Sequence, residues 1–220
     1  TVYGVPDKIP VKETAPIKPA FSTYGYTKQV GEIVLTDFFK TKSKSSLTLL
    51  RYFNPIGAHP SGLIGELPIG VPSNLVPYIT QTGVGKRKKL TVFGKDYDTA
   101  DGTCIRDYIH VDDLANARVA SLKKGLNSCE SIKIYNVGTG KGVSVLDVVT
   151  AFEKVSNQKL NYEFGPRRDG DVPEIYSDNE LIKNKLGWEA KFSLEDCLEH
   201  SWKWEKNLVK FKYKSEKKQD

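Results

Sequence analysis

The chain has 220 residues, of which 39% are hydrophobic, and it carries a formal net charge of +6 at pH 7. This length can bury one substantial core or two small ones, and no segment approaches the roughly 20 consecutive apolar residues of a membrane-spanning helix. The 3 cysteines and 3 histidines are scattered, which argues against a metal site and a disulfide framework. We therefore expect a globular protein of the cytoplasm that holds no metal and has no membrane partner.

Much of the positive charge comes from the end of the chain, residues 203–220, where lysines outnumber acidic residues. A solvated helix end followed by a frayed, Lys-rich tail over 209–220 accounts for this run. We therefore expect no nucleic-acid partner.

The first residues, 1–19, form a Pro-rich connection with no strand and no secretory signal ahead of it. From Ser22 to about Lys42, apolar residues recur at helical spacing until the Ser/Lys cluster TKSKSS ends the run. The short apolar segment SLTLLRYF (46–53) then predicts a buried strand. A helix followed by such a strand indicates an α/β layer, and we expect the chain to begin in the middle of a domain.

Residues 56–73 contain too much Gly and Pro for a regular element, so we expect an irregular excursion there. A helix over 74–88 and a strand over 90–94 follow. Residues 95–111 are expected to form a long loop that returns to the scaffold.

A helix is predicted to start at Asp112 or Asp113 and to end near Gly125, before a strand over 132–137. The next segment, GTGKG followed by VSVLDVVTAFEKV, has the order strand, Gly-rich turn and helix of a nucleotide-binding loop. It matches neither standard fingerprint, because G-x-G-x-x-G needs glycine at Val143 and the phosphate loop needs Ser or Thr at Gly142. A tight turn that caps a helix at Ser144 is favoured over a phosphate cradle.

The remaining elements are a strand over 160–164, a short helix closed by Gly187, and a longer amphipathic helix over 193–209. We find no internal repeat.

Tyr24 and Lys28 are candidates for acid-base chemistry, because residues four apart in a helix share one face. A phenol is a poor base at neutral pH, and its phenolate needs roughly 4 kcal/mol of stabilisation to work there. An ammonium group one turn away supplies part of it. Tyr213 and Lys217 have the same spacing in the Lys-rich tail, so the context of Tyr24 is what distinguishes it.

Six blocks of sequence stand out: TVYG (1–4), YGYTK (24–28), RYFNPIGAHPSGLIGE (51–66), SNLVPYI (73–79), DGTCIRDYIHVDDLA (101–115) and GPRRDGDVPEIYSD (165–178). In this order they resemble the UDP-glucose 4-epimerases of the extended short-chain dehydrogenase/reductase family. The resemblance extends from Thr1 to about residue 208. It implies an α/β fold: the C-terminal part of a doubly wound, Rossmann-like parallel-sheet domain, with a smaller mixed α/β substrate domain.

The implied domain boundaries are residues 1–55 for the remnant of the NAD-binding domain, with returns near 104–140, and mainly 56–208 for the UDP-sugar-binding domain. The implied reaction interconverts UDP-galactose and UDP-glucose through a 4-keto intermediate, with NAD as the cofactor. Tyr24 matches the family's catalytic tyrosine, and Lys28 the lysine that holds the nicotinamide ribose and activates the tyrosine. The resemblance therefore assigns cofactor contacts to both residues and to Tyr52.

For the UDP-hexose, a diphosphate favours guanidinium groups. Arg106 and Arg168 match the family's diphosphate contacts, and Asp171 matches a ribose contact. The resemblance assigns further substrate contacts to Thr1, Tyr52, Phe53, Asn54, Asn74, Leu75, Thr91 and Phe93. Ile175 occupies the position that controls entry of N-acetylated sugars, and an isoleucine there leaves their acceptance open. His59 and His110 are expected to be scaffold residues.

Other readings of the residues remain open at this stage. Tyr24 can be an ordinary residue of an amphipathic helix, the arginines can pair with Asp107, Asp169 or Asp171 at the surface, and Asn54 before a proline is an ordinary turn signal. At the level of function, the alternatives are another nucleotide-sugar short-chain enzyme, such as a 4,6-dehydratase or a different epimerase, and a non-catalytic UDP-sugar-binding fragment.

The family's Gly-rich fingerprint lies in a stretch of roughly 120 residues that this sequence lacks, and its catalytic Ser or Thr is expected two positions before Thr1. We therefore expect the 220 residues alone to be inactive. The resemblance also implies a homodimer, with the helix over Ser22–Lys42 as the candidate contact.

Overall fold

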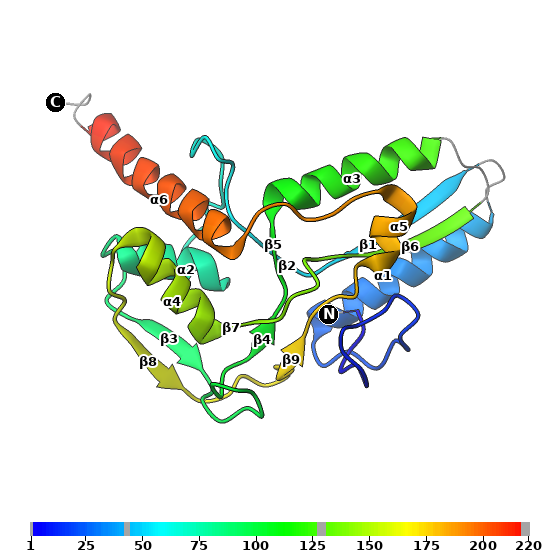
Figure 1. The fold of residues 1–220 in the computed structure, drawn as a ribbon, viewed down its shortest axis with the longest axis horizontal. Coiled ribbons are helices and arrows are strands. Elements are labelled where there is room, and N and C mark those ends of the chain that lie inside the picture. The colour runs from blue at the N-terminus through cyan, green and yellow to red at the C-terminus, as the bar shows by residue number, and fades with distance from the viewer. Residues whose placement is uncertain (1, 42–44, 127–130, 217–220) are drawn as a thin grey trace.

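The computed structural model describes residues 2–41, 45–126 and 131–216. Its elements gather into two groups that lie at opposite ends of the molecule (Figure 1). We call the group around strands β1 and β6 the sheet body, and the group around helices α2, α4 and α6 the helical body. Short strands connect the two, so the chain has the α/β fold that the sequence predicts.

The sheet body is a parallel pair of strands with helices packed around it. Strands β1 (Ser46–Tyr52) and β6 (Ser131–Val137) pair in register, with Leu49 opposite Ile134. Helices α1 (Thr23–Lys40), α3 (Val111–Leu126) and α5 (Glu180–Leu186) complete this body. Parallel pairing fits a sheet connected through helices, as in doubly wound folds. The apolar side chains of its core are Ile109, Leu114, Ala117, Tyr135, Val137, Ile182 and Trp188.

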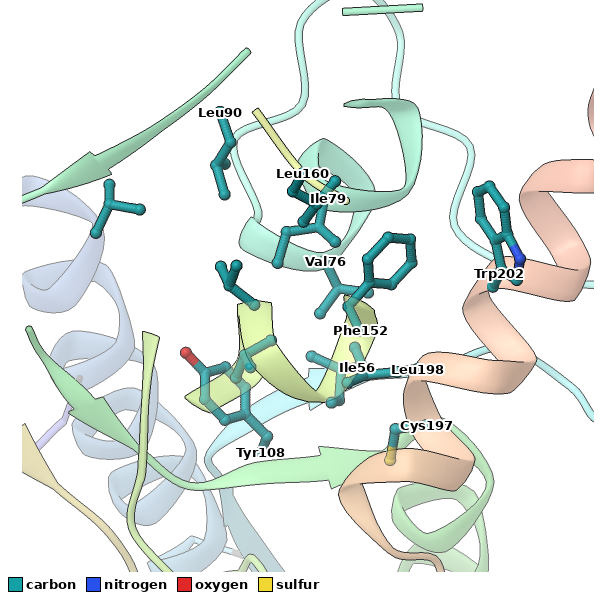
Figure 2. Close-up of a cluster of buried hydrophobic side chains, with 13 residues drawn as sticks. Ile56, Val76, Ile79, Leu90, Tyr108, Phe152, Leu160, Cys197, Leu198 and Trp202 are labelled. Atoms are coloured by element: carbon teal, nitrogen blue, oxygen red, sulfur yellow. The ribbon is translucent and has the colours of Figure 1, made fainter. Parts of the chain in front are cut away.

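The helical body holds the larger core (Figure 2). Helices α2 (Leu75–Gly83), α4 (Val145–Ser156) and α6 (Leu194–Glu216) pack beside the parallel strands β3 (Leu90–Phe93) and β8 (Tyr162–Gly165). Phe152 of α4 is fully buried and meets Trp202 of α6 edge to face, with ring centroids 5.4 Å apart. This core fixes β3, which carries two of the predicted substrate contacts.

Five short strands connect the bodies. β2 (Asn54–Ile56) pairs in parallel with β5 (Tyr108–His110), and β4 (Ile105–Arg106) lies between β7 (Val143–Ser144) and β9 (Glu174–Ile175). A third, small cluster consists of buried Tyr3, Val11 and Ile175, the last of which belongs to β9. This cluster packs the first residues of the chain against the short strands that connect the two bodies.

Several predicted elements are confirmed. The helix from Ser22 begins at Thr23, because the Ser22 hydroxyl accepts a hydrogen bond from the free backbone amide of Gly25 at 3.1 Å and so caps the first turn. The tight turn before α4 is also confirmed: Ser144 and Asp147 form a reciprocal capping box. The short helix closes at Gly187, whose φ of +63° is the left-handed conformation of a helix end.

Three predicted boundaries are wrong. The helix expected over 74–88 ends at Gly83, and Gly85 adopts a φ of +77° that a helix cannot continue. The loop expected over 95–111 contains β4 and β5, whose pairing partners lie far away in sequence. The tail expected to fray from residue 209 is helical up to Glu216, while residues 217–220 lie outside the described residues.

Candidate functional site

Tyr24 and Lys28 lie on one exposed face at the start of α1. The Lys28 Nζ atom is 4.9 Å from the centroid of the Tyr24 ring, so the ammonium group lies over the aromatic face. Tyr24 is 61% exposed, which leaves its phenol accessible to a reactant. The four-residue spacing therefore brings the two side chains together, as the sequence predicts.

The residues at the end of β1 face different surroundings. Tyr52 is exposed, with the Arg118 guanidinium 5.8 Å from its ring centroid, whereas Phe53 packs against the third cluster. Asn54 is exposed, and its backbone amide donates to the Asp107 carbonyl at 2.9 Å. Asn54 thus lies in a paired strand and not in an ordinary turn, and its side chain is accessible.

The α2 and β3 residues are also accessible. Asn74 caps α2 by position, and its side-chain amide donates to Glu66 at 2.8 Å, while Leu75 is half-buried against the core. On β3, burial alternates, so Thr91 and Phe93 point away from the buried face of the strand.

The two arginines predicted to bind the diphosphate, Arg106 and Arg168, each contact another predicted site residue. Arg106 Nη1 donates to the backbone carbonyl of Val172 at 2.6 Å, and Nη2 lies 3.4 Å from Asp171 Oδ1. The Arg168 guanidinium lies 4.0 Å from the centroid of the Phe93 ring. The Asp171 amide donates to the Arg168 carbonyl at 3.3 Å, so the two groups adjoin each other. Together they offer the chemistry that a nucleoside diphosphate needs: cations for the phosphates and an aromatic ring for the base.

Two predicted residues need separate comment. Ile175 is only 8% exposed and packs in the third cluster with Tyr3 and Val11, so its side chain is largely covered. Thr1 lies outside the described residues. His110 is a buried scaffold residue, as predicted: its Nε2 lies 3.0 Å from His200 Nδ1, and its ring stacks on Phe192.

The sequence did not reveal the buried ion pair that attaches α1 to the sheet. Arg51 of β1 donates from Nε and Nη2 to the two carboxylate oxygens of Glu32, at 2.8 and 2.7 Å. Burial disfavours the charged guanidinium, but hydrogen bonding and electrostatic attraction from Glu32 and Tyr3 together more than offset this effect and raise the pKa of Arg51. An arginine inside an apolar strand was the available signal, because a buried charge requires a partner.

Asp107 was missed as well. Its fully buried carboxylate accepts five hydrogen bonds, from the backbone amides of Thr139, Gly140 and Ser177 and from the hydroxyls of Thr139 and Ser177. Asp107 follows Arg106, so this hub fixes the backbone that presents the arginine.

The hydrogen bonds to Asp107 also determine whether the Gly-rich turn after β6 can bind the phosphates of a dinucleotide. The amides of Thr139 and Gly140 donate to Asp107 at 2.8 and 3.2 Å, so they are not presented to a phosphate. The turn is therefore not a pyrophosphate cradle, as the sequence predicts. Tyr24 and Lys28, in contrast, are exposed and chemically suited to the hydroxyl groups of a ribose.

Among the described residues, an open hollow lies away from the predicted site, and there is neither a metal-binding cluster nor a helix that could span a membrane. An open hollow of about 600 Å³ lies between α3 and residues 185–191, and none of the predicted site residues lines it. Within residues 2–41, 45–126 and 131–216, no three His, Cys, Asp or Glu side chains are close enough together to bind a metal. The helices of the same ranges include none with the length and apolar character of a bilayer span.

Comparison with known proteins gives consistent matches. A family model described as GDP-mannose 4,6 dehydratase matches residues 1–201. A UDP-glucose 4-epimerase of Bacillus subtilis is 51% identical over 209 residues, which cover 95% of this chain and 61% of that protein. The crystal structure of UDP-glucose 4-epimerase from Bifidobacterium longum in complex with NAD+ and UDP has a TM-score of 0.90 at 42% identity, over 94% of this chain and 61% of that one.

A further crystal structure, UDP-glucose 4-epimerase from Stenotrophomonas maltophila with bound NAD and formylated UDP-arabinopyranose, has a TM-score of 0.89 at 44% identity. It covers 95% of this chain, and this chain covers 62% of it. The matches confirm the resemblance that the six sequence blocks predict. They also show that the chain spans 61 to 62% of the length of these relatives.

Proposed function

The chain belongs to the GDP-mannose 4,6 dehydratase family, and we propose that it carries the catalytic pair and the nucleotide-sugar contacts of an NAD-dependent UDP-glucose 4-epimerase. The observation that carries the proposal is the Tyr24–Lys28 pair, exposed at the start of α1 with the ammonium group 4.9 Å from the ring centroid. The relatives whose names and bound molecules point to this reaction match the chain over 94% or more of its length.

In the proposed reaction, the Tyr24 phenolate takes the proton of the sugar 4-hydroxyl and returns it after the 4-keto sugar has turned over. Lys28 stabilises the phenolate by its positive charge and binds the nicotinamide ribose. Bound NAD would supply the acceptor and the donor of a hydride at C4 of the sugar, so the overall reaction would involve no net oxidation.

The proposed nucleotide contacts come from β3, β4 and the loop after β8. We assign the diphosphate to Arg106 and Arg168, the ribose to Asp171, and the uracil to the face of β3 that carries Thr91 and Phe93. Arg106 is held by backbone carbonyls, so its guanidinium is oriented before a ligand arrives, which reduces the entropy cost of binding. The remaining proposed contacts with the sugar nucleotide are Thr1, Tyr52, Phe53, Asn54, Asn74, Leu75 and Ile175.

A second function has one observation in its favour. The Gly-rich turn after β6 directs its amides to Asp107, so it offers no phosphate site to a dinucleotide. A UDP-sugar-binding module without turnover is therefore the alternative for these 220 residues by themselves. The division into an NAD-binding remnant over 1–55 and a substrate domain mainly over 56–208 stays a prediction.

Two measurements on the chain test the proposal. Titration calorimetry with UDP should detect binding to the chain, and an epimerase assay with UDP-galactose should detect turnover only when the portion that the relatives possess in addition is supplied. Binding without turnover even in the presence of that portion would favour the binding module. Replacing Arg168 with Gln removes a charge-assisted contact and should weaken UDP binding about tenfold or more. Arg87→Gln, which removes a guanidinium beside α2, is the matched control and should leave affinity unchanged. Equal affinities for both variants would contradict the assigned diphosphate site.

The proposal includes a homodimer in the complete enzyme. Ile33, Val34 and Phe38 of α1 are 59 to 60% exposed, and a contiguous apolar face of this kind supports a contact between copies. Sedimentation of Val34→Glu beside the unsubstituted protein would test it. The buried free thiols of Cys104 and Cys197 support our assignment to the cytoplasm.

A further inference from the structure

Helix α1 buries two residues, Gly25 and Gln29, so its one buried side chain is the polar side chain of Gln29, which is 9% exposed. Its neighbour Lys28 points to the exposed face. A helix of the sheet body would be expected to bury apolar residues, yet Val30 and Phe39 are only half-buried and the other aliphatic and aromatic side chains of α1 are exposed. The buried contact of α1 near Tyr24 is therefore polar.

Both hydrogens of the Gln29 amide are used. Nε2 donates to the backbone carbonyl of Val2 at 2.8 Å and to that of Lys18 at 2.6 Å. The two carbonyls belong to segments that also bind each other, because the Lys18 amide donates to the Tyr3 carbonyl at 3.1 Å. Gln29 thus joins α1 to two adjoining backbone segments at once.

These two segments fit closely and are anchored on their other side. A Cβ atom at Gly4 would lie 2.9 Å from the Pro19 carbonyl oxygen, so there is no room for a side chain between the two segments at this position. The Tyr3 side chain is 2% exposed, and its hydroxyl donates to Asn136 of β6 at 2.5 Å. Residues 2–4 are consequently fixed to the sheet, and Gln29 fixes α1 to residues 2–4.

We propose that Gln29 is a positioning residue that sets the Tyr24–Lys28 pair relative to residues 2–4, and this role rests on the proposed function. We call the two Gln29 hydrogen bonds the clamp. Residues 2–4 belong to the TVYG block that matches the family, so the clamp sets the distance between the proposed catalytic base and this matched segment. Misplacement of a reacting group by about 1 Å can cost about a hundredfold in rate. The clamp therefore acts on turnover more than on substrate affinity.

The first test uses the chain alone and asks whether the clamp exists. Gln29→Glu keeps the shape but presents a carboxylate to two carbonyl oxygens, so both hydrogen bonds are lost at pH 8. The Lys18 amide itself donates to the Tyr3 carbonyl, so its protection against hydrogen exchange reports how often the two segments held by Gln29 open. That protection should fall about tenfold or more, because the segments open more easily once both Gln29 hydrogen bonds are lost. At pH 5.5, a protonated carboxyl can donate one bond, and protection should partly return. Gln29→Leu should show no such return, and Gln158→Glu, an exposed substitution of the same chemistry, should match the parent at both pH values.

The second test uses an extended protein in which the amino-terminal portion of the Bacillus subtilis relative precedes Thr1. Gln29→Glu should lower kcat for UDP-galactose by about ten- to a hundredfold, with KM changed less than about twofold. A purely structural role would lower the amount of folded protein and leave kcat per folded molecule unchanged.

The outcomes separate the two claims. Unchanged protection of Lys18 in Gln29→Glu would overturn the clamp, whatever the kinetics. Lost protection with kcat unchanged would overturn the positioning role and leave the proposed function intact. If the extended parent bound NAD and UDP but showed no turnover, the proposed function would fail and the catalytic role of Gln29 with it, while the exchange result would still decide the clamp.

Discussion

Replacing Arg51 with Met should destabilise the chain by about 3 kcal/mol, at the lower end of the range for breaking a buried ion pair. The pair is well enclosed: the Arg51 side chain is 6% exposed and the Glu32 side chain 16%. Two charge-assisted hydrogen bonds, at 2.8 and 2.7 Å, are lost together, and the Glu32 carboxylate is left without its cation. The residual exposure of Glu32 lets water reach the carboxylate, so the cost stays near the lower end.

Urea unfolding followed by circular dichroism measures this cost directly. Arg51→Met, Glu32→Gln and the double variant form a double-mutant cycle, in which we expect a coupling of at least about 1 kcal/mol. Lys40→Met is the matched control, because Lys40 and Asp37 form an ion pair whose side chains are 66% and 65% exposed. An exposed pair contributes less than about 1 kcal/mol. If Arg51→Met cost no more than Lys40→Met, or if the cycle were additive, α1 would not be held to the sheet by this pair.

Three further predictions concern a buried core residue, a helix cap and a buried histidine. Phe152→Ala should cost about 3 to 5 kcal/mol in urea unfolding, because Phe152 is fully buried, whereas Phe164→Ala, which truncates a 42% exposed ring, should cost about 1 kcal/mol or less. Ser144→Ala removes the capping box of α4 and should cost about 1 kcal/mol in the same assay; a cost near zero would show that water replaces the cap. Burial lowers the pKa of His110, so the unfolded chain takes up its proton first as pH falls below about 6.5. The urea midpoint should therefore fall between pH 7 and pH 5, and it should fall less in His110→Gln; equal slopes for both proteins would contradict the assignment.

Local signals in the sequence were sufficient for elements that depend on local interactions. The start of α1 at Ser22 and the start of α4 at Ser144 follow from side chains that accept free helix amides within one turn. The end of α2 was missed because Gly83 is compatible with a helix, and only the backbone at Gly85 shows that the chain turns there. Strands β4 and β9 have two residues each, so their existence depends on pairing partners and not on any periodic pattern.

The candidate site shows the same division. Tyr24 and Lys28 could be identified because a four-residue spacing and a matching block coincide in one helix. The Arg51–Glu32 pair and the Asp107 hub could not, since their partners are 19 to 70 residues away in sequence. Ile175 was predicted to line the sugar site from its position in a motif, but its burial against Tyr3 and Val11 depends on the fold. Long-range polar contacts thus determine the parts of the site that a local pattern cannot reveal.

The most direct test of the central claim is the rate of UDP-galactose conversion by the extended protein with Tyr24 replaced by Phe. Removing the phenolic hydroxyl should lower kcat by about a hundredfold or more, the contribution of general acid-base catalysis. Tyr26→Phe is the matched control, because Tyr26 lies two residues further along the same helix and is equally exposed, at 62% against 61%. We expect that control to retain the parent rate. Conversion by Tyr24→Phe at the rate of Tyr26→Phe would contradict the claim that Tyr24 is the catalytic base.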